Sequence, residues 1–144
     1  MDRLLQQLLA NAPDAILVAD RQGLIRYWNG GAQRMFGHTA DEAVGQSLDL
    51  IIPEKLRPRH WQGYFRVMDS GQTKYTADLL TSPGVRKDGA RVSLEFSIVL
   101  LRTDDGAIDG CAAIMRDVTT RWQREKALQE RLAACENSEP SAST

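Results

Sequence analysis

The stretch RVSLEFSI, residues 91–98, decides the fold class of this 144-residue chain. Apolar side chains alternate with polar ones along it, so that Val92, Leu94, Phe96 and Ile98 lie between Arg91, Ser93, Glu95 and Ser97. A period of two places each set on its own face of an extended chain. The stretch therefore predicts a half-buried β-strand, which extends to Leu101.

The chain on either side of this strand predicts further strands and the turns between them. Val85 to Gly89 and Asp104 to Gly106 carry the residues of tight turns, and Pro83-Gly84 is expected to interrupt the strand before them. Near the N-terminus, two apolar runs separated by Asp20 to Gly23 predict a hairpin. The sequence thus predicts an antiparallel sheet, with strands over residues 15–19, 24–28, 74–82, 91–101 and 108–115.

Short helices are expected between the second and third of these strands. One opens at Asn29 and ends at Gly37, and another starts at Thr39, with Glu42 in the position of a capping box. A longer helix ends at Gly71 and carries His60. The arrangement is α+β, with short helices on one face of the sheet.

A helix is also expected at each end of the chain. Residues 1–11 form an amphipathic helix with Leu4, Leu5, Leu8 and Leu9 on one side, whose packing against a partner predicts a homodimer. Residues 118–135 form a signalling helix with a weak coiled-coil seam, which consists of Val118, Arg121, Glu125, Leu128, Leu132 and Cys135. Residues 12–117 are the central domain, and residues 136–144 are expected to be disordered.

Composition excludes several classes of function. With 42% hydrophobic residues the chain fits one compact domain, and its net charge of -1 predicts no binding of nucleic acid or of an acidic membrane. No run has the length of a membrane-spanning helix or the character of a secretory signal, which predicts a cytoplasmic protein. No nucleophile–base pair, phosphate loop or metal motif occurs, so we expect no enzymatic activity.

His60 is the candidate binding residue. Gly63, Tyr64 and Val67 follow it at the spacing of one helix face, and Gly63 leaves room there for a flat group. An imidazole on a largely apolar face, beside space for a planar group, is what a heme iron requires. The alternative is a histidine on the rim of a surface helix.

Several motifs together resemble a PAS domain over roughly residues 5 to 120. They are Asn29 at a helix start, Phe36-Gly37, Asp41-Glu42, Gly45, Arg86-Lys87-Asp88-Gly89 and Arg116-Asp117-Val118-Thr119. The resemblance implies a five-stranded antiparallel sheet that cups a small-molecule pocket beneath short helices. It also implies a sensory role in bacterial signal transduction, with a downstream effector domain or protein.

Residues 51 to 98 are similar to the heme-binding gas sensors of this family, particularly to its oxygen-sensing histidine kinases. That resemblance implies heme b held by His60 as the axial ligand of the iron, with Arg66 beside a propionate. It places Leu80, Phe96 and Ile98 on the distal side of the heme.

The chain departs from these sensors on the distal side. Leu80 stands where the kinases have an arginine, and Asp78 where a related phosphodiesterase has a methionine. Leucine donates no hydrogen bond, so the sequence favours carbon monoxide, nitric oxide or redox sensing over selective oxygen binding. Two alternatives to heme remain open: a noncovalent flavin, and a PAS dimerisation or protein-interaction module with no cofactor or with an unidentified metabolite.

Overall fold

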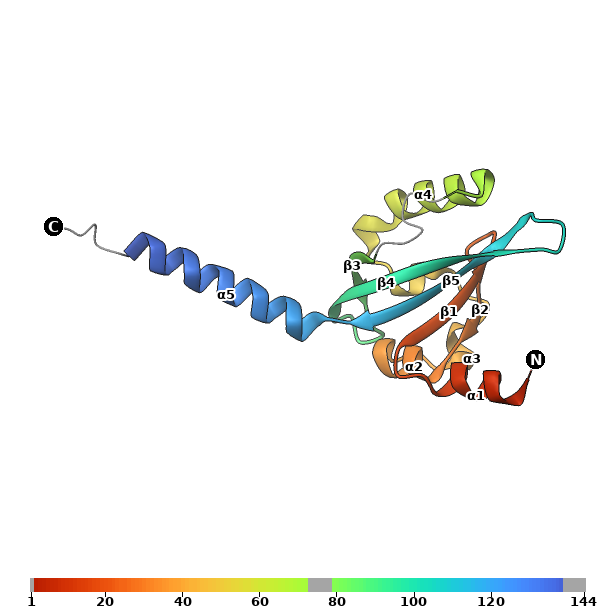
Figure 1. Ribbon diagram of the computed structural model, residues 1–144, viewed down its shortest axis with the longest axis horizontal. Helices are drawn as coiled ribbons and strands as arrows, with labels where there is room; N and C mark the ends of the chain where they lie inside the picture. Colours follow the sequence, from red (N-terminus) through yellow and green to blue (C-terminus); the bar gives the residue numbers. More distant parts are fainter. Residues whose placement is uncertain (1, 73–78, 139–144) are drawn as a thin grey trace.

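In the computed structural model, residues 2–72 and 79–138 are described. One five-stranded antiparallel sheet has the strand order β2-β1-β5-β4-β3, with the helices α2, α3 and α4 on one face (Figure 1). The strands are β1 (Ala15–Asp20), β2 (Ile25–Trp28), β3 (Leu80–Val85), β4 (Arg91–Arg102) and β5 (Ile108–Asp117). The helices are α1 (Arg3–Asn11), α2 (Gly30–Phe36), α3 (Ala40–Ala43), α4 (Arg57–Ser70) and α5 (Thr119–Ser138), with 3₁₀ turns η1 (Leu48–Ile51) and η2 (Glu54–Leu56). The predicted α+β class and the five-stranded sheet are confirmed.

Strand β3 corrects one detail of the sequence prediction. Pro83 and Gly84 do not interrupt the strand, because they pair with Ser93 and Val92 of β4. β3 is an edge strand, where a proline without an N–H is tolerated. A Cβ at Gly84 would lie 2.7 Å from a methyl carbon of Leu94, so glycine lets the two strands approach. Residues 74–78 of the predicted strand lie outside the described residues.

Local capping explains where the short helices begin. Asn29 is buried, and its Oδ1 accepts hydrogen bonds from the amides of Ala32 (2.9 Å) and Ile16 (2.8 Å). Its Nδ2 donates to the carbonyl of Leu9 (2.8 Å), which ties α1 to the start of α2. The predicted capping box of Thr39 and Glu42 is present at α3.

The core divides into two clusters on the inner face of the sheet. The larger lies under α2, α3 and η1 and includes Phe36 and Ile25, which are fully buried. The smaller lies under α4 and consists of Met68, Ile108 and Cys111, with partly buried neighbours Tyr64, Val67, Ile98 and Leu100. The helix that carries His60 therefore covers the second cluster.

The terminal helices lie outside this core. α1 has no buried residue and packs near α2, and Leu4, Leu5 and Leu8 are exposed. α5 projects away from the domain (Figure 1) and reaches Ser138, three residues beyond its predicted end, so residues 136–138 are not disordered as expected. The first helix-breaking residue after Thr119 is Pro140, which explains the extension. Among the described residues, no helix has both the length and the apolar character needed to cross a membrane.

Candidate functional site

The site is built around α4, whose two ends are fixed by hydrogen bonds. At the start, the guanidinium of Arg57 donates to the carbonyls of Ile52 (3.1 Å) and Asp49 (3.2 Å). At the end, Gly71 takes a left-handed conformation with φ +71°, and its amide donates to the carbonyl of Val67 (2.8 Å). These contacts set the position of the helix along its own axis.

One side of α4 packs against the sheet and its hairpin turn. Trp61, Tyr64 and Met68 share this side, because they follow one another at intervals of three and four residues. Met68 is buried against Ile108, whereas Trp61 and Tyr64 are half-buried. The indole N–H of Trp61 donates to the carboxylate of Asp49 (2.7 Å). We call Trp61, Tyr64 and Met68 the packed side of α4.

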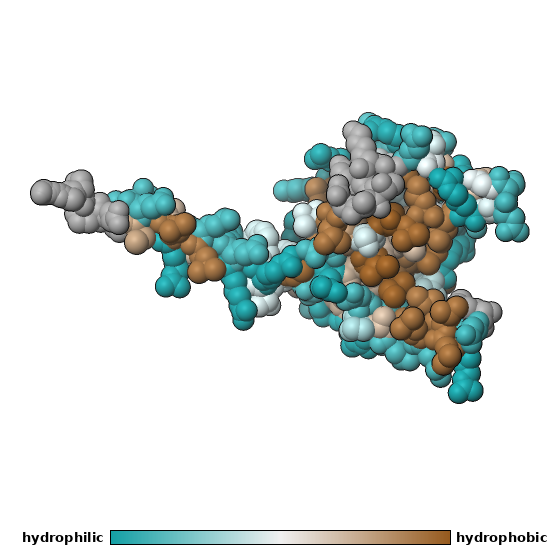
Figure 2. All heavy atoms as spheres, in the orientation of Figure 1, coloured by the Kyte–Doolittle hydropathy of each residue, from teal (hydrophilic) through white to brown (hydrophobic). Residues whose placement is uncertain are grey.

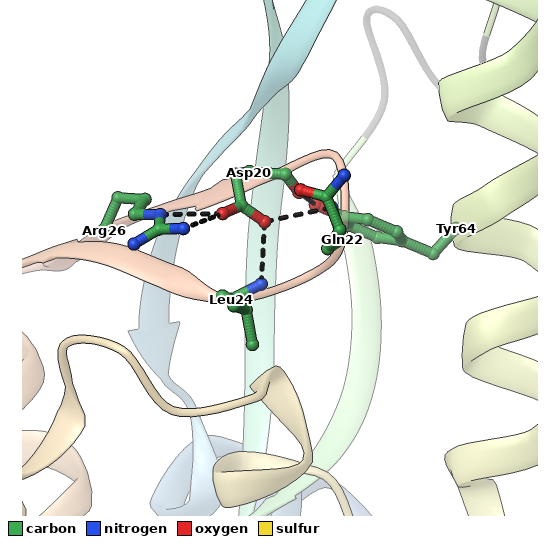
Figure 3. A network of polar contacts seen from close by, with 5 residues as sticks. All are labelled: Asp20, Gln22, Leu24, Arg26 and Tyr64. Atoms are coloured by element: carbon green, nitrogen blue, oxygen red, sulfur yellow. Dashed lines mark hydrogen bonds and ion pairs between the residues drawn. The ribbon is translucent and has the colours of Figure 1, made fainter.

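Tyr64 connects this side to the turn between β1 and β2 (Figure 3). Its hydroxyl donates to the backbone carbonyl of Asp20 (2.5 Å). The Cys111 sulfur lies 3.8 Å from the Tyr64 hydroxyl oxygen. Burial raises the pKa of Tyr64 far above its usual range, and burial also raises the pKa of the Cys111 thiol. Both groups therefore stay protonated near neutral pH, and the Tyr64 hydroxyl remains a donor.

The carboxylate of Asp20 organises the turn itself. One oxygen accepts from the amides of Gln22 (2.9 Å) and Leu24 (3.0 Å), and the other accepts from Nε of Arg26 (2.7 Å). Burial acts to raise the pKa of Asp20, but the hydrogen bonds from Leu24 and Arg26 outweigh it and hold the pKa below its usual value. Asp20 is thus an ionised and well-fixed residue at the end of β1.

His60 lies at the margin of the packed side. Its ring centroid is 4.6 Å from that of Trp61 and 5.6 Å from that of Tyr64. The imidazole is half-buried, and its Nδ1 is fully buried without a hydrogen-bond partner in the described part of the chain. Burial lowers the pKa of His60, although the Asp49 carboxylate acts in the opposite direction. The neutral imidazole that results is the form that binds metals.

Gly63 and Arg66 follow His60 on the open side of the helix. A Cβ at Gly63 would meet no heavy atom within 4 Å, and Arg66 is exposed. We call Gly63 and Arg66 the open side of α4. The sequence grouped Gly63, Tyr64 and Val67 with His60 on one face, but the structure divides this group: Tyr64 and Val67 join the core cluster, while Gly63 borders open space.

The three remaining predicted residues lie on the strands opposite α4. Ile98 packs with Val67 against the smaller cluster, and Phe96 packs against the larger one. Leu80 pairs with Phe96 across β3 and β4, so both side chains point to the inner face of the sheet. The fold therefore gathers Leu80, Phe96 and Ile98 into one apolar wall. Their predicted contact with a cofactor stays a prediction.

Several residues of the site have no role in the sequence analysis, among them Asp20, Trp61, Met68 and Cys111. Trp61 adjoins His60 in the sequence, and this adjacency was the available signal. Asp20 and Cys111 lie 44 and 47 residues from Tyr64, and chain topology alone brings them to it. Among the described residues, no group of three or more His, Cys, Asp or Glu side chains could hold a metal ion. A single histidine instead suits a cofactor that brings its own remaining ligands.

Comparison with known proteins places this geometry in a family. A family model for the PAS fold matches residues 9–123. Sensor protein FixL of Bradyrhizobium diazoefficiens is 29% identical over 126 residues, which cover 88% of this chain and 25% of FixL. Oxygen sensor protein DosP of Escherichia coli is 19% identical over 127 residues, which cover 88% of this chain and 16% of DosP. The chain thus spans a quarter or less of the length of these curated relatives.

A solved structure shares the fold. An RNA-binding light-oxygen-voltage receptor superposes with a TM-score of 0.72 at 26% sequence identity, over 91% of this chain and 36% of the receptor chain. The family match covers most of the chain, including every strand and the whole of α4. This chain therefore belongs to the PAS-fold family, as a sensory domain of signal transduction.

Proposed function

We propose that this PAS domain binds heme b through His60 and senses a diatomic gas or a redox state. The observation that carries the proposal is the buried Nδ1 of His60, which lacks a hydrogen-bond partner in the described part of the chain. A buried polar atom without a partner is costly, and coordination of a metal would remove that cost. In this proposal the domain binds and relays, and it does not itself catalyse a reaction.

The residues around His60 suit a heme. Gly63 leaves space at the helix surface, and Val67 and Ile98 supply apolar contacts. The exposed Arg66 follows His60 by six residues, on a side of α4 where a propionate could meet it near solvent. When bound, heme supplies an iron that takes up a diatomic ligand and changes its oxidation state.

The wall opposite α4 determines which ligand is favoured. Leu80, Phe96 and Ile98 provide no hydrogen-bond donor from their side chains. Bound oxygen gains more from a donor than carbon monoxide does, so we expect weak discrimination in favour of oxygen. The likeness to DosP, which is named an oxygen sensor, supports a gas ligand but does not transfer its selectivity to this chain.

Strand β4 offers a route for the signal. Its inner residues Phe96 and Ile98 belong to the proposed pocket, whereas its outer residues hold the start of α5. The Ser93 carbonyl accepts from the amide of Val118 (2.8 Å), and Glu95 pairs with Arg121 (2.5 Å). A displacement of β4 would therefore move α5, and an effector beyond this chain would receive the change.

Hemin titration of the purified protein tests the proposal. We expect near-stoichiometric uptake with a Soret band that shifts on reduction and addition of carbon monoxide. His60→Ala should abolish uptake, while His38→Ala, at the other histidine of the chain, should leave it unchanged. A full Soret band in His60→Ala would refute the assignment of His60 as the ligand. A flavin spectrum of the purified protein would show that the cofactor is a flavin and not heme.

The second candidate function is a dimerisation or protein-interaction module without heme. Leu4, Leu5 and Leu8 of α1 are 69%, 51% and 66% exposed. Apolar surface also covers the outer sheet face, whose exposed members include Val99 and Ile114, and it continues onto α1 (Figure 2). We propose that a second copy of the chain covers this surface in either case.

The area needed for a dimer supports the use of both regions. Burial of one leucine removes about 60–120 Å² from water, so three leucines provide roughly 200–350 Å². A stable interface needs about 800 Å² from each partner. The leucines of α1 alone are therefore insufficient, and the outer sheet face is expected to supply the remainder.

Sedimentation of charge variants tests this interface. Leu4→Glu combined with Leu8→Glu should convert dimers to monomers, because charged side chains would be buried against the partner. Val44→Glu is the control, since Val44 is 42% exposed on a different helix end. An unchanged sedimentation profile of the double variant would rule out α1 as the interface.

A further inference from the structure

The start of α4 is attached to the β1–β2 turn by two aromatic residues, Trp61 and Tyr64, whose rings both contact that of His60. Trp61 lies against Gly23, where a Cβ would be only 2.1 Å from the Trp61 ring. Tyr64 donates its hydroxyl to the carbonyl of Asp20, at the first residue of the same turn. In the described part of the chain, this is the one hydrogen bond that an α4 side chain donates to a strand backbone.

The acceptor is held firmly in place. The Asp20 carbonyl also accepts from the amide of Gly23 (2.9 Å), so both of its lone pairs are used. The Asp20 amide donates to the carbonyl of Leu24 (3.0 Å), and the side chain accepts from Gln22, Leu24 and Arg26. Asp20 is constrained by all of these hydrogen bonds. The bond from Tyr64 to its carbonyl therefore fixes the position of Tyr64 and does not displace Asp20.

Rotation of α4 would move His60. Tyr64 follows His60 by four residues, so the two side chains project from nearly the same side of the helix. The contact of their rings, at 5.6 Å between centroids, makes the imidazole sensitive to any shift of the tyrosine. Trp61 also contacts the imidazole, at 4.6 Å, and lies 5.3 Å from Tyr64, so the three rings form one cluster.

We infer that Tyr64 is a positioning residue for His60, which uses its hydrogen bond to the Asp20 carbonyl to set the rotation of α4. The role of the imidazole as an iron ligand rests on the proposed function, whereas the positioning itself is a property of the protein without heme. A force on His60 that would rotate α4 is therefore resisted by the fixed β1–β2 turn through the same contact.

Tyr64→Phe tests the inference, because it removes only the hydroxyl. Tyr27→Phe, in strand β2, is the matched control. In the heme-free protein we expect Tyr64→Phe to shift the ring proton resonances of His60 and to speed amide exchange in residues 20–24. In the hemin-loaded ferrous protein we expect it to shift the iron–histidine stretching band. Tyr27→Phe should change none of these.

The outcomes separate this inference from the proposed function. If wild-type protein takes up no hemin, heme binding fails, and the His60 resonances of the heme-free protein still decide the role of Tyr64. If those resonances and the amide exchange are the same in Tyr64→Phe and wild type, the positioning role is overturned. A lowered melting temperature with unchanged His60 resonances would likewise overturn it, because Tyr64 would then stabilise the fold without positioning His60. Trp61→Phe, read by the same resonances, serves if Tyr64→Phe does not fold.

Discussion

The two sides of α4 differ in what they contact, although they belong to the same 14-residue helix. On the packed side, Met68 is 3% exposed and Tyr64 makes a hydrogen bond to the sheet. On the open side, Gly63 has no neighbour at its Cβ position and Arg66 is exposed. His60 lies at the boundary between them. The comparison shows how one helix can be anchored to the fold along one side and leave open space along the other, with His60 between them.

The two sides of α4 should differ most in how much their residues contribute to the free energy of unfolding. Met68→Ala should lower the free energy of unfolding by about 2–5 kcal/mol, because it leaves a cavity beside Ile108 and Cys111. Arg66→Ala should change it by no more than about 0.5 kcal/mol, since a surface position loses little. Urea denaturation measures both. Equal losses would mean that α4 has no packed side.

A pair of glycine substitutions gives the next largest contrast. Gly23→Ala should destabilise the protein by about 2–4 kcal/mol, because its φ of +82° disfavours alanine and the new Cβ would collide with Trp61. Gly63→Ala should stabilise it by about 0.5–1 kcal/mol through helix propensity, since nothing obstructs the methyl group. Thermal denaturation of the heme-free variants checks the signs. A loss of stability in Gly63→Ala would show that the open side is occupied.

A bulky residue at Gly63 separates the effect of the open side on stability from its effect on heme binding. Gly63→Phe should leave the unfolding free energy of the heme-free protein within about 1 kcal/mol of wild type, because open space borders this position. It should reduce hemin uptake, because the ring would occupy the space that the flat cofactor needs. Hemin titration beside a denaturation curve separates the two effects. Undiminished uptake would place the cofactor elsewhere.

The smallest expected effect is the dependence of stability on pH. Burial lowers the pKa of His60 below 6.5 in the folded protein, so the unfolded chain binds the proton more readily. The stability of the heme-free protein should therefore be constant above about pH 6.5 and fall as the pH drops from there toward the folded pKa. His60→Gln should remove this part of the pH dependence, and His38→Gln is the control. Denaturation curves across this range provide the measurement, and an unchanged slope in His60→Gln would exclude His60 as its source.

Local signals in the sequence predicted most of the elements. The alternation over residues 91–98 correctly placed β4, and Asn29, Thr39 and Gly71 correctly placed helix ends. These signals act within a few residues, where side-chain hydrogen bonds and backbone conformation are set by neighbours. Pro83-Gly84 misled the prediction, because its effect depends on the strand lying at the sheet edge.

The candidate site was predicted less completely. The sequence singled out His60 as a binding residue, and this role stays a prediction; the structure shows that burial leaves its Nδ1 without a partner in the described residues. Helical periodicity shows which residues share a face, but not which face turns toward the sheet. It therefore could not show that the packed side consists of Trp61, Tyr64 and Met68. The orientation comes from Asp20 and Gly23, which belong to a distant turn.

The antiparallel strands, the helix that carries His60 and the apolar strand opposite it follow from the sequence, and the resemblance to PAS domains implied how they are arranged. Those features depend on local capping, turn residues and a period of two, all of which are encoded in neighbouring residues. How far α4 is rotated, and hence where the imidazole lies, is set only in the folded protein. That rotation depends on contacts between residues more than 35 positions apart, Trp61 with Gly23 and Tyr64 with Asp20, and such contacts exist only once the sheet has formed.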